Sequence, residues 1–154
     1  MRLLTSLYML CALTCNAEDH DNSYLKLAGG LNDNNLLHTK SAMVGHQGPL
    51  LGVFDYQLEL GLLQHPQGIS VFGGPSIGLS IVQTGYYAKV FTGPSILSPT
   101  DDRLGTTLEI SSDLEIGVRD ERGVSMGIGY KHISNAGTGG VNLGRDFIYF
   151  KVGF

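Results

Sequence analysis

Alternation of apolar and polar residues is the dominant pattern of this 154-residue chain. It is clearest in residues 107–119, where leucine, isoleucine and valine fill nearly every second position and Ser112 is the exception among them. Successive side chains of a β-strand point to opposite faces, so a period of two predicts a strand with one apolar and one polar face. Residues 54–62 and 76–82 repeat the pattern. We therefore predict an all-β protein.

The number of these segments predicts a closed barrel. Glycine and proline divide the chain at short intervals, and eight strands are expected at residues 22–31, 36–45, 51–64, 68–82, 84–97, 105–119, 123–134 and 146–154. An even number of strands of about ten residues is typical of an eight-stranded antiparallel transmembrane β-barrel of outer-membrane type, with its apolar face toward lipid. Side chains fill so small a barrel, which argues against a channel. The expected interior charges are Asp55, Glu59, Lys89, Glu109, Asp113, Glu115, Arg119, Lys131 and Lys151.

The N-terminus has the pattern of a secretory signal. Arg2 supplies the charged start, residues 3–15 are mostly apolar, and small residues lead to Ala17. We expect a signal peptide at residues 1–17 and an outer-membrane β-barrel domain at residues 18–154.

Composition narrows the function further. Cys11 and Cys15 both lie in the expected signal, which would leave the mature chain without a disulfide or a thiol nucleophile. The net charge of −4 offers no basic patch for a nucleic acid. Phe154 ends the alternating final strand, and a terminal aromatic residue there resembles the assembly signal of bacterial outer-membrane proteins. We expect a location in the bacterial outer membrane.

The candidate chemistry lies near the C-terminus. His132 and Ser134 are two positions apart on an expected strand and therefore share a face. Because Lys131 and Lys151 should point inward, His132, Ser134 and Asp146 should point outward, toward lipid. An imidazole can activate a serine hydroxyl, and a carboxylate can fix the imidazole tautomer.

Donors for an oxyanion could come from the amides of Ala136 and Gly137 and from the side chain of Asn142. On spacing alone, however, a chance His-x-Ser pair beside an ordinary Asn-Ala-Gly turn is the more frequent case.

The run His132-Ile133-Ser134-Asn135-Ala136-Gly137, followed by Asn142, Gly144 and an acid at 146, resembles the signature of the lipid A 3-O-deacylase family, PagL. The specific match covers residues 129–154. It implies an eight-stranded outer-membrane barrel that hydrolyses the ester-linked acyl chain at position 3 of lipid A, the lipid part of lipopolysaccharide. It also implies that no metal or other cofactor is needed, and it leaves a homodimer open.

Carried over by position, the resemblance makes Ser134 the nucleophile and His132 the general base. Asp146 stands where the family has glutamate, and this shorter side chain is the departure from the signature. The oxyanion-hole positions are matched by Asn142, Gly137 and Ala136. Asn135 matches a further, supporting motif position.

Two alternatives remain open. A non-catalytic small outer-membrane barrel, structural or adhesive, predicts long external loops, whereas the loops here look short. A soluble lipid-binding barrel of the periplasm predicts an apolar interior, against which the alternating charges argue.

Other polar residues carry weaker signals. The remaining histidines lack ligand spacing, so no zinc site is expected, and these are His20, His38, His46 and His65. Asp101 and Asp102 follow Pro99 and are expected in a solvated loop. Ser76 and Ser95 lie in Gly-Pro-Ser segments without a histidine nearby in the sequence.

Overall fold

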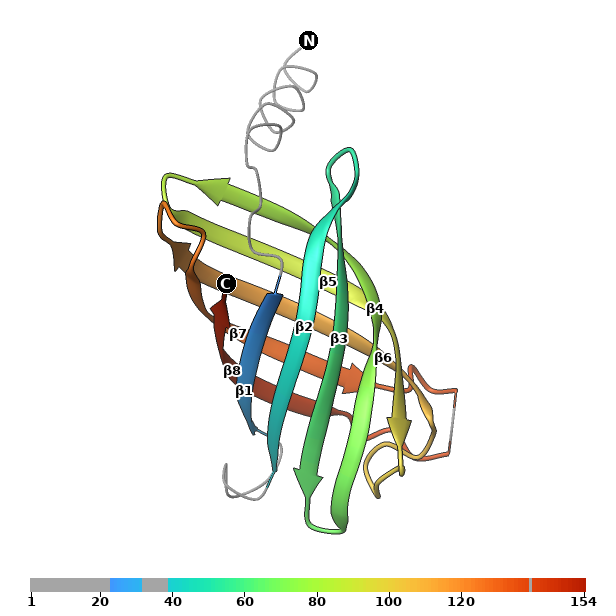
Figure 1. Cartoon of the computed structure of the whole chain (residues 1–154). Helices are drawn as coiled ribbons and strands as arrows, with labels where there is room; N and C mark the ends of the chain where they lie inside the picture. The colour runs from blue at the N-terminus through green and yellow to red at the C-terminus, as the bar shows by residue number, and fades with distance from the viewer. Residues whose placement is uncertain (1–22, 32–38, 139) are drawn as a thin grey trace.

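Eight antiparallel strands close into a single barrel in the computed structural model, which describes residues 23–31, 39–138 and 140–154 (Figure 1). The strands are β1 (Ser23–Gly30), β2 (Lys40–Leu51), β3 (Phe54–His65), β4 (Gly68–Gln83), β5 (Tyr86–Ser98), β6 (Leu108–Arg119), β7 (Ser125–Ser134) and β8 (Arg145–Gly153). Each strand pairs with its neighbours in sequence, and β1 pairs with β8 to close the barrel. The predicted fold class is confirmed. The expected signal peptide lies outside the described residues.

The predicted second strand was wrong in its position. It was expected at residues 36–45, whereas β2 runs to Leu51, and residues 36–38 lie outside the described part of the chain. Gly45 lies within the strand and does not end it. The position requires glycine because a Cβ there would lie only 2.1 Å from the hydroxyl of Tyr24. The glycine makes room for this ring inside the barrel. Pro49 is tolerated near the strand end, where the pairing register with β3 shifts.

The barrel interior is held together by charge pairs. Lys131 Nζ lies 2.6 Å from Glu59 Oε1 and 2.7 Å from Asp113 Oδ2, and Lys26 Nζ lies 3.0 Å and 3.2 Å from the other oxygens of the same carboxylates. We call these four residues the interior ion ring. Buried charges persist only when they are paired and hydrogen-bonded, and here two cations meet two anions.

The predicted inward face is confirmed for most of its members. Asp55 and Arg119 are partly buried. The other seven side chains are almost completely buried, and these are Glu59, Lys89, Glu109, Asp113, Glu115, Lys131 and Lys151. The outward positions are apolar, and Leu60, for example, is 58% exposed. A charged interior and an apolar outer surface are the reverse of what a soluble lipid-binding barrel requires. No helix among the residues that the structure describes is long and apolar enough to cross a membrane.

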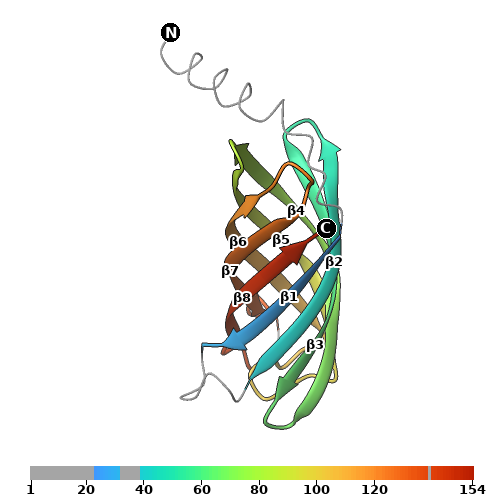
Figure 2. The ribbon, with the colours of Figure 1, turned by 60° about the vertical axis from the view of Figure 1, so that its left-hand side comes forward.

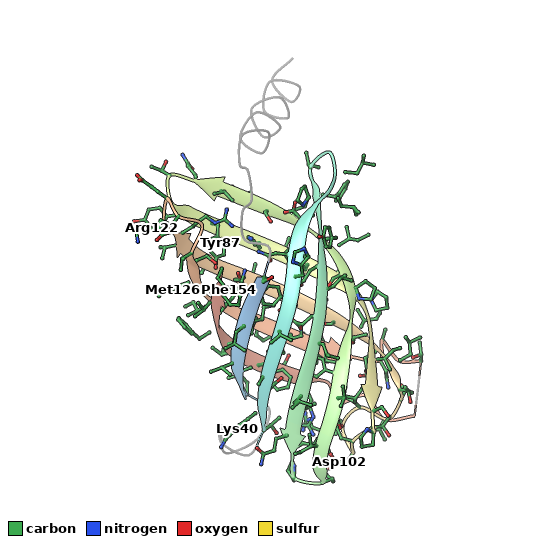
Figure 3. The ribbon with its side chains drawn as sticks, in the orientation of Figure 1. Lys40, Tyr87, Asp102, Arg122, Met126 and Phe154 are labelled. Atoms are coloured by element: carbon green, nitrogen blue, oxygen red, sulfur yellow. The ribbon has the colours of Figure 1, made fainter. Side chains whose placement is uncertain are left out.

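The two ends of the barrel differ in their connections. One end carries the longer connections at residues 99–107 and 135–144, whereas the other has the tight turns at residues 52–53, 84–85 and 120–124. The strands tilt steeply between the two ends (Figure 2). Figure 3 shows Lys40 and Asp102 at the loop end, and Arg122 and Phe154 toward the opposite end. In bacterial barrels the longer loops face the cell exterior, which makes the loop end the outer one.

Candidate active site

The register between β7 and β8 places His132 directly opposite Asp146. Their side chains meet on the outer wall, where His132 Nδ1 lies 2.7 Å from Asp146 Oδ1. A carboxylate accepts the proton of Nδ1–H, which leaves Nε2 unprotonated and able to act as a base. Both side chains are partly exposed, at 40% and 22%. Aspartate thus reaches the imidazole despite being shorter than glutamate, because the two residues are cross-strand partners.

Tyr130 completes this carboxylate site. Its hydroxyl donates a hydrogen bond to Asp146 Oδ1, the same oxygen that meets His132. Tyr130 precedes His132 by two residues on β7 and so shares its outward face. Tyr130 was not among the site residues predicted from the sequence. One feature of the sequence could have indicated it. A tyrosine hydroxyl is a hydrogen-bond donor on the face where the carboxylate of Asp146 is expected, and a carboxylate beside lipid needs donors.

Ser134 is the last residue of β7 and points outward near His132. It pairs with Ile110 of β6 on one side, whereas β8 begins only at Arg145, opposite Ile133, on the other. Within the described part of the chain, no hydrogen bond joins Ser134 Oγ to the imidazole. Such bonds are often long in unliganded active sites and tighten when substrate is bound.

Gly144 makes space for the imidazole. A Cβ at this position would lie 3.0 Å from His132 Cε1 and 3.8 Å from Nε2. The backbone also has φ +65° here, in the left-handed region that favours glycine. This glycine of the motif therefore has two physical reasons to be glycine.

Asn135 organises the loop that follows the serine. Its side chain is buried, and Oδ1 accepts from Gly137 N at 2.9 Å while Nδ2 donates to Val141 O at 2.8 Å. Its backbone N–H donates to Asn142 Oδ1 at 3.2 Å. Asn135 thus joins both arms of the loop, which gives a structural role to this motif position.

The three expected oxyanion donors have different surroundings. The N–H of Gly137 is already engaged by Asn135. Asn142 Oδ1 accepts a hydrogen bond from the N–H of Asn135, so the two N–H groups on Asn142 Nδ2 can donate to other partners. The N–H of Ala136 makes no hydrogen bond to another described residue, and Ala136 adopts φ +52°. In this conformation the available donors are therefore Ala136 N–H and Asn142 Nδ2.

A second loop, residues 99–107, braces the first. Asp101 is buried against Arg145 and also accepts hydrogen bonds from the N–H groups of Arg103 and Leu104, at 2.9 Å and 2.7 Å. The prediction that Asp101 is solvated was wrong, because the cation of Arg145, 44 residues later, lies beside it. Its neighbour Asp102 is indeed exposed, at 61%.

Direct contacts then connect this loop to the site. Arg103 Nε donates to Gly144 O at 2.9 Å, and Leu143 N donates to Arg103 O at 3.0 Å. Leu104 also forms an isolated bridge with Asn142. The two loops are therefore joined beside the imidazole.

The other polar residues singled out from the sequence lie elsewhere. Ser76 and Ser95 are buried on β4 and β5. His46 is on β2, and His65 is at the end of β3, bonded to Ser70 Oγ. His20 and His38 lie outside the described residues.

A family model described as lipid A 3-O-deacylase (PagL) matches residues 23–154, which include all eight strands of the barrel. This chain belongs to the PagL family. It is therefore an ester hydrolase of the bacterial outer membrane, and its family deacylates lipid A. No curated protein matches the chain.

Two solved structures have a similar barrel fold. The crystal structure of the outer membrane enzyme PagL has a TM-score of 0.62 at 15% identity, covering 85% of this chain and 98% of that one. A barrel described under "De novo design of transmembrane beta-barrels" has a TM-score of 0.60 at 12% identity, covering 87% and 94%. At these identities the likeness shows the fold alone.

Proposed function

We propose that this PagL-family barrel removes the ester-linked 3-O-acyl chain of lipid A with Ser134 as nucleophile, His132 as general base and Asp146 as the group that orients it. The observation that carries the proposal is the 2.7 Å contact between His132 Nδ1 and Asp146 Oδ1 on the outer wall, on the same face as Ser134. A substrate whose acyl chains lie in the membrane can reach a site that faces lipid.

The proposed reaction has two steps. Ser134 Oγ attacks the ester carbonyl carbon while His132 Nε2 takes its proton. The carbonyl oxygen becomes an oxyanion beside Ala136 N–H and Asn142 Nδ2. The bond to the sugar oxygen then breaks, His132 returns the proton to that oxygen, and the acyl group remains on Ser134. Water, deprotonated by His132, attacks the carbonyl carbon of this acyl-enzyme. The bond to Ser134 Oγ then breaks, His132 returns the proton to that oxygen, and the free fatty acid leaves.

Tyr130 would support the aspartate in this scheme. The imidazolium formed during both steps is stabilised by the carboxylate of Asp146, provided that the carboxylate stays in place. The hydrogen bond from Tyr130 holds it. A second donor on the same oxygen limits the motion of the side chain, so the imidazole is oriented by a fixed partner.

The location of the site fits a substrate in the outer leaflet. Ser134 and the loop after it lie at the loop end of the barrel, which faces the cell exterior. Export by a signal peptide at residues 1–17, followed by a mature domain at residues 18–154, is part of the proposal. The pairing of two barrels into a homodimer stays a prediction.

Purified protein in detergent micelles tests the proposal directly. Wild type should release free fatty acid from lipopolysaccharide, whereas Ser134→Ala and His132→Ala should release almost none. Ser23→Ala, at the opposite end of the barrel, serves as the control and should match wild type. If folded wild type released no fatty acid, the non-catalytic small barrel would be the better account. If both site variants released as much fatty acid as wild type, Ser134 and His132 would be excluded from the mechanism.

A further inference from the structure

One band of polar side chains crosses the lipid-facing wall. Strand pairing places Thr92 opposite Ser112, Ser112 opposite His132, and His132 opposite Asp146. We call these four residues the polar row. Each belongs to a different strand, from β5 to β8, and cross-strand partners lie side by side. Because the strands tilt relative to the barrel axis (Figure 2), a row of cross-strand partners runs obliquely across the wall.

The surroundings of Thr92 and Ser112 are apolar. Along β5 and β6 the neighbouring outward side chains include Val90, Ile110 and Leu114, all more than two-fifths exposed. A hydroxyl gains nothing from lipid, and valine or alanine would pack there without the cost of an unsatisfied polar group. The presence of two hydroxyls in this place therefore calls for an explanation beyond packing.

Part of the explanation is their mutual hydrogen bond. Thr92 Oγ1 and Ser112 Oγ are 2.9 Å apart, and one hydroxyl donates to the other. Two hydroxyls carry two hydrogens, however, and this bond uses one of them. The second hydrogen has no acceptor among the residues that the structure describes. The pair thus presents one spare donor to the membrane.

The pair is close to the reacting groups. Neighbouring strands lie about 5 Å apart, which puts Ser112 about 5 Å and Thr92 about 10 Å from His132 along the row. A lipid that carries several acyl chains has carbonyl oxygens of its other chains within about this distance of the ester under attack. A carbonyl oxygen is an acceptor, which is what the spare hydroxyl donor lacks.

We propose that Thr92 and Ser112 form a binding subsite for the carbonyl oxygen of a second acyl chain of the substrate. This inference rests on the proposed function and adds to it. The catalytic residues act on one ester, and the hydroxyl pair recognises the neighbouring chain. The subsite favours lipids with several acyl chains over lipids with one.

The test combines kinetics with binding. Thr92→Val and Ser112→Ala are combined in one protein, because valine and alanine fit an apolar wall. The KM for lipopolysaccharide should rise about five- to tenfold, which is the effect of losing about one hydrogen bond, and the fall in kcat should be smaller. The exchange Thr92→Ser with Ser112→Thr keeps both hydroxyls and should restore most of the affinity. Ser23→Ala is the matched control for loss of a hydroxyl.

Binding is measured separately in a Ser134→Ala background, where substrate is not consumed. Adding Thr92→Val and Ser112→Ala should raise the Kd for lipopolysaccharide by a similar factor. An unchanged Kd and an unchanged KM would overturn the subsite. If wild type released no fatty acid, the proposed function would fail, while the Kd comparison would still decide whether the hydroxyl pair binds the lipid.

Discussion

The interior ion ring and the polar row lie back to back on the two strands that they share, β6 and β7. Asp113 and Lys131 are paired inside the barrel, and their sequence neighbours Ser112 and His132 are paired outside. Inside, each ammonium meets two carboxylates, and the ring is electrically balanced. Outside, a base nitrogen and a hydroxyl hydrogen remain available for a ligand. A step of one residue along a strand therefore separates groups that stabilise the barrel from groups that can react.

The largest effect expected in the polar row follows from Asp146→Asn. An amide cannot stabilise the imidazolium, and it can leave His132 in the wrong tautomer, so kcat should fall on the order of 10³- to 10⁴-fold. Fatty acid release from lipopolysaccharide measures this loss. Asp146→Glu restores the family residue and should keep kcat within about tenfold of wild type. Full activity of the asparagine variant would remove Asp146 from the mechanism.

The interior ion ring should respond in stability instead. Lys131→Met leaves Glu59 and Asp113 with one buried cation between them, which should cost about 3–5 kcal/mol of unfolding free energy. Urea unfolding in detergent or lipid vesicles gives this value. Asp113→Leu added to Lys131→Met restores charge balance, because Lys26 still pairs with Glu59, and should recover much of the loss. A double variant no more stable than the single one would contradict the ring as described.

Gly144→Ala tests how closely the loop fits the imidazole. The new Cβ would press on His132 Cε1 from a backbone with positive φ, so kcat should fall between about tenfold and a hundredfold. Gly52→Ala is the matched control, since Gly52 has a similar φ of +61° but nothing within 4 Å of its added Cβ. Equal kinetics for the two variants would mean that the contact with the ring has no catalytic consequence.

Tyr130→Phe should give the smallest of these effects. Loss of one hydrogen bond to the carboxylate should lower kcat about tenfold with little change in KM. Tyr86→Phe removes a hydroxyl from another exposed tyrosine, at the opposite end of the wall, and should be neutral. In an Asp146→Asn background Tyr130→Phe should add little, because both changes act on the same group. An additive loss in the double variant would show that Tyr130 acts elsewhere.

Most of what could be predicted from the sequence follows from the alternation of side chains between the two faces of a strand. The alternation around Ser112 and around Lys131 was enough to separate the two faces of β6 and β7. It also brought His132 and Ser134 to one face, since that inference needs only a period of two. The number of strands followed from the same alternation together with the turns.

Contacts between distant segments could not be predicted in this way. The buried pair of Asp101 and Arg145 forms because two loops lie in contact, and no local sequence pattern predicts that contact. The need for glycine at position 45, within β2, comes from the position of the Tyr24 ring on β1. The hydrogen bond from Tyr130 to Asp146 depends on the register of two strands, whereas the alternation of residues predicts only which face each side chain is on.

The most direct test of the account is the mass of lipid A from a bacterium that makes acylated lipopolysaccharide and expresses this chain. Wild-type protein should remove one acyl chain from position 3, and Ser134→Ala, folded in the same outer membrane, should leave lipid A intact. Equal removal by both proteins, or an unchanged lipid A with folded wild type, would contradict catalysis by Ser134 on the outer wall.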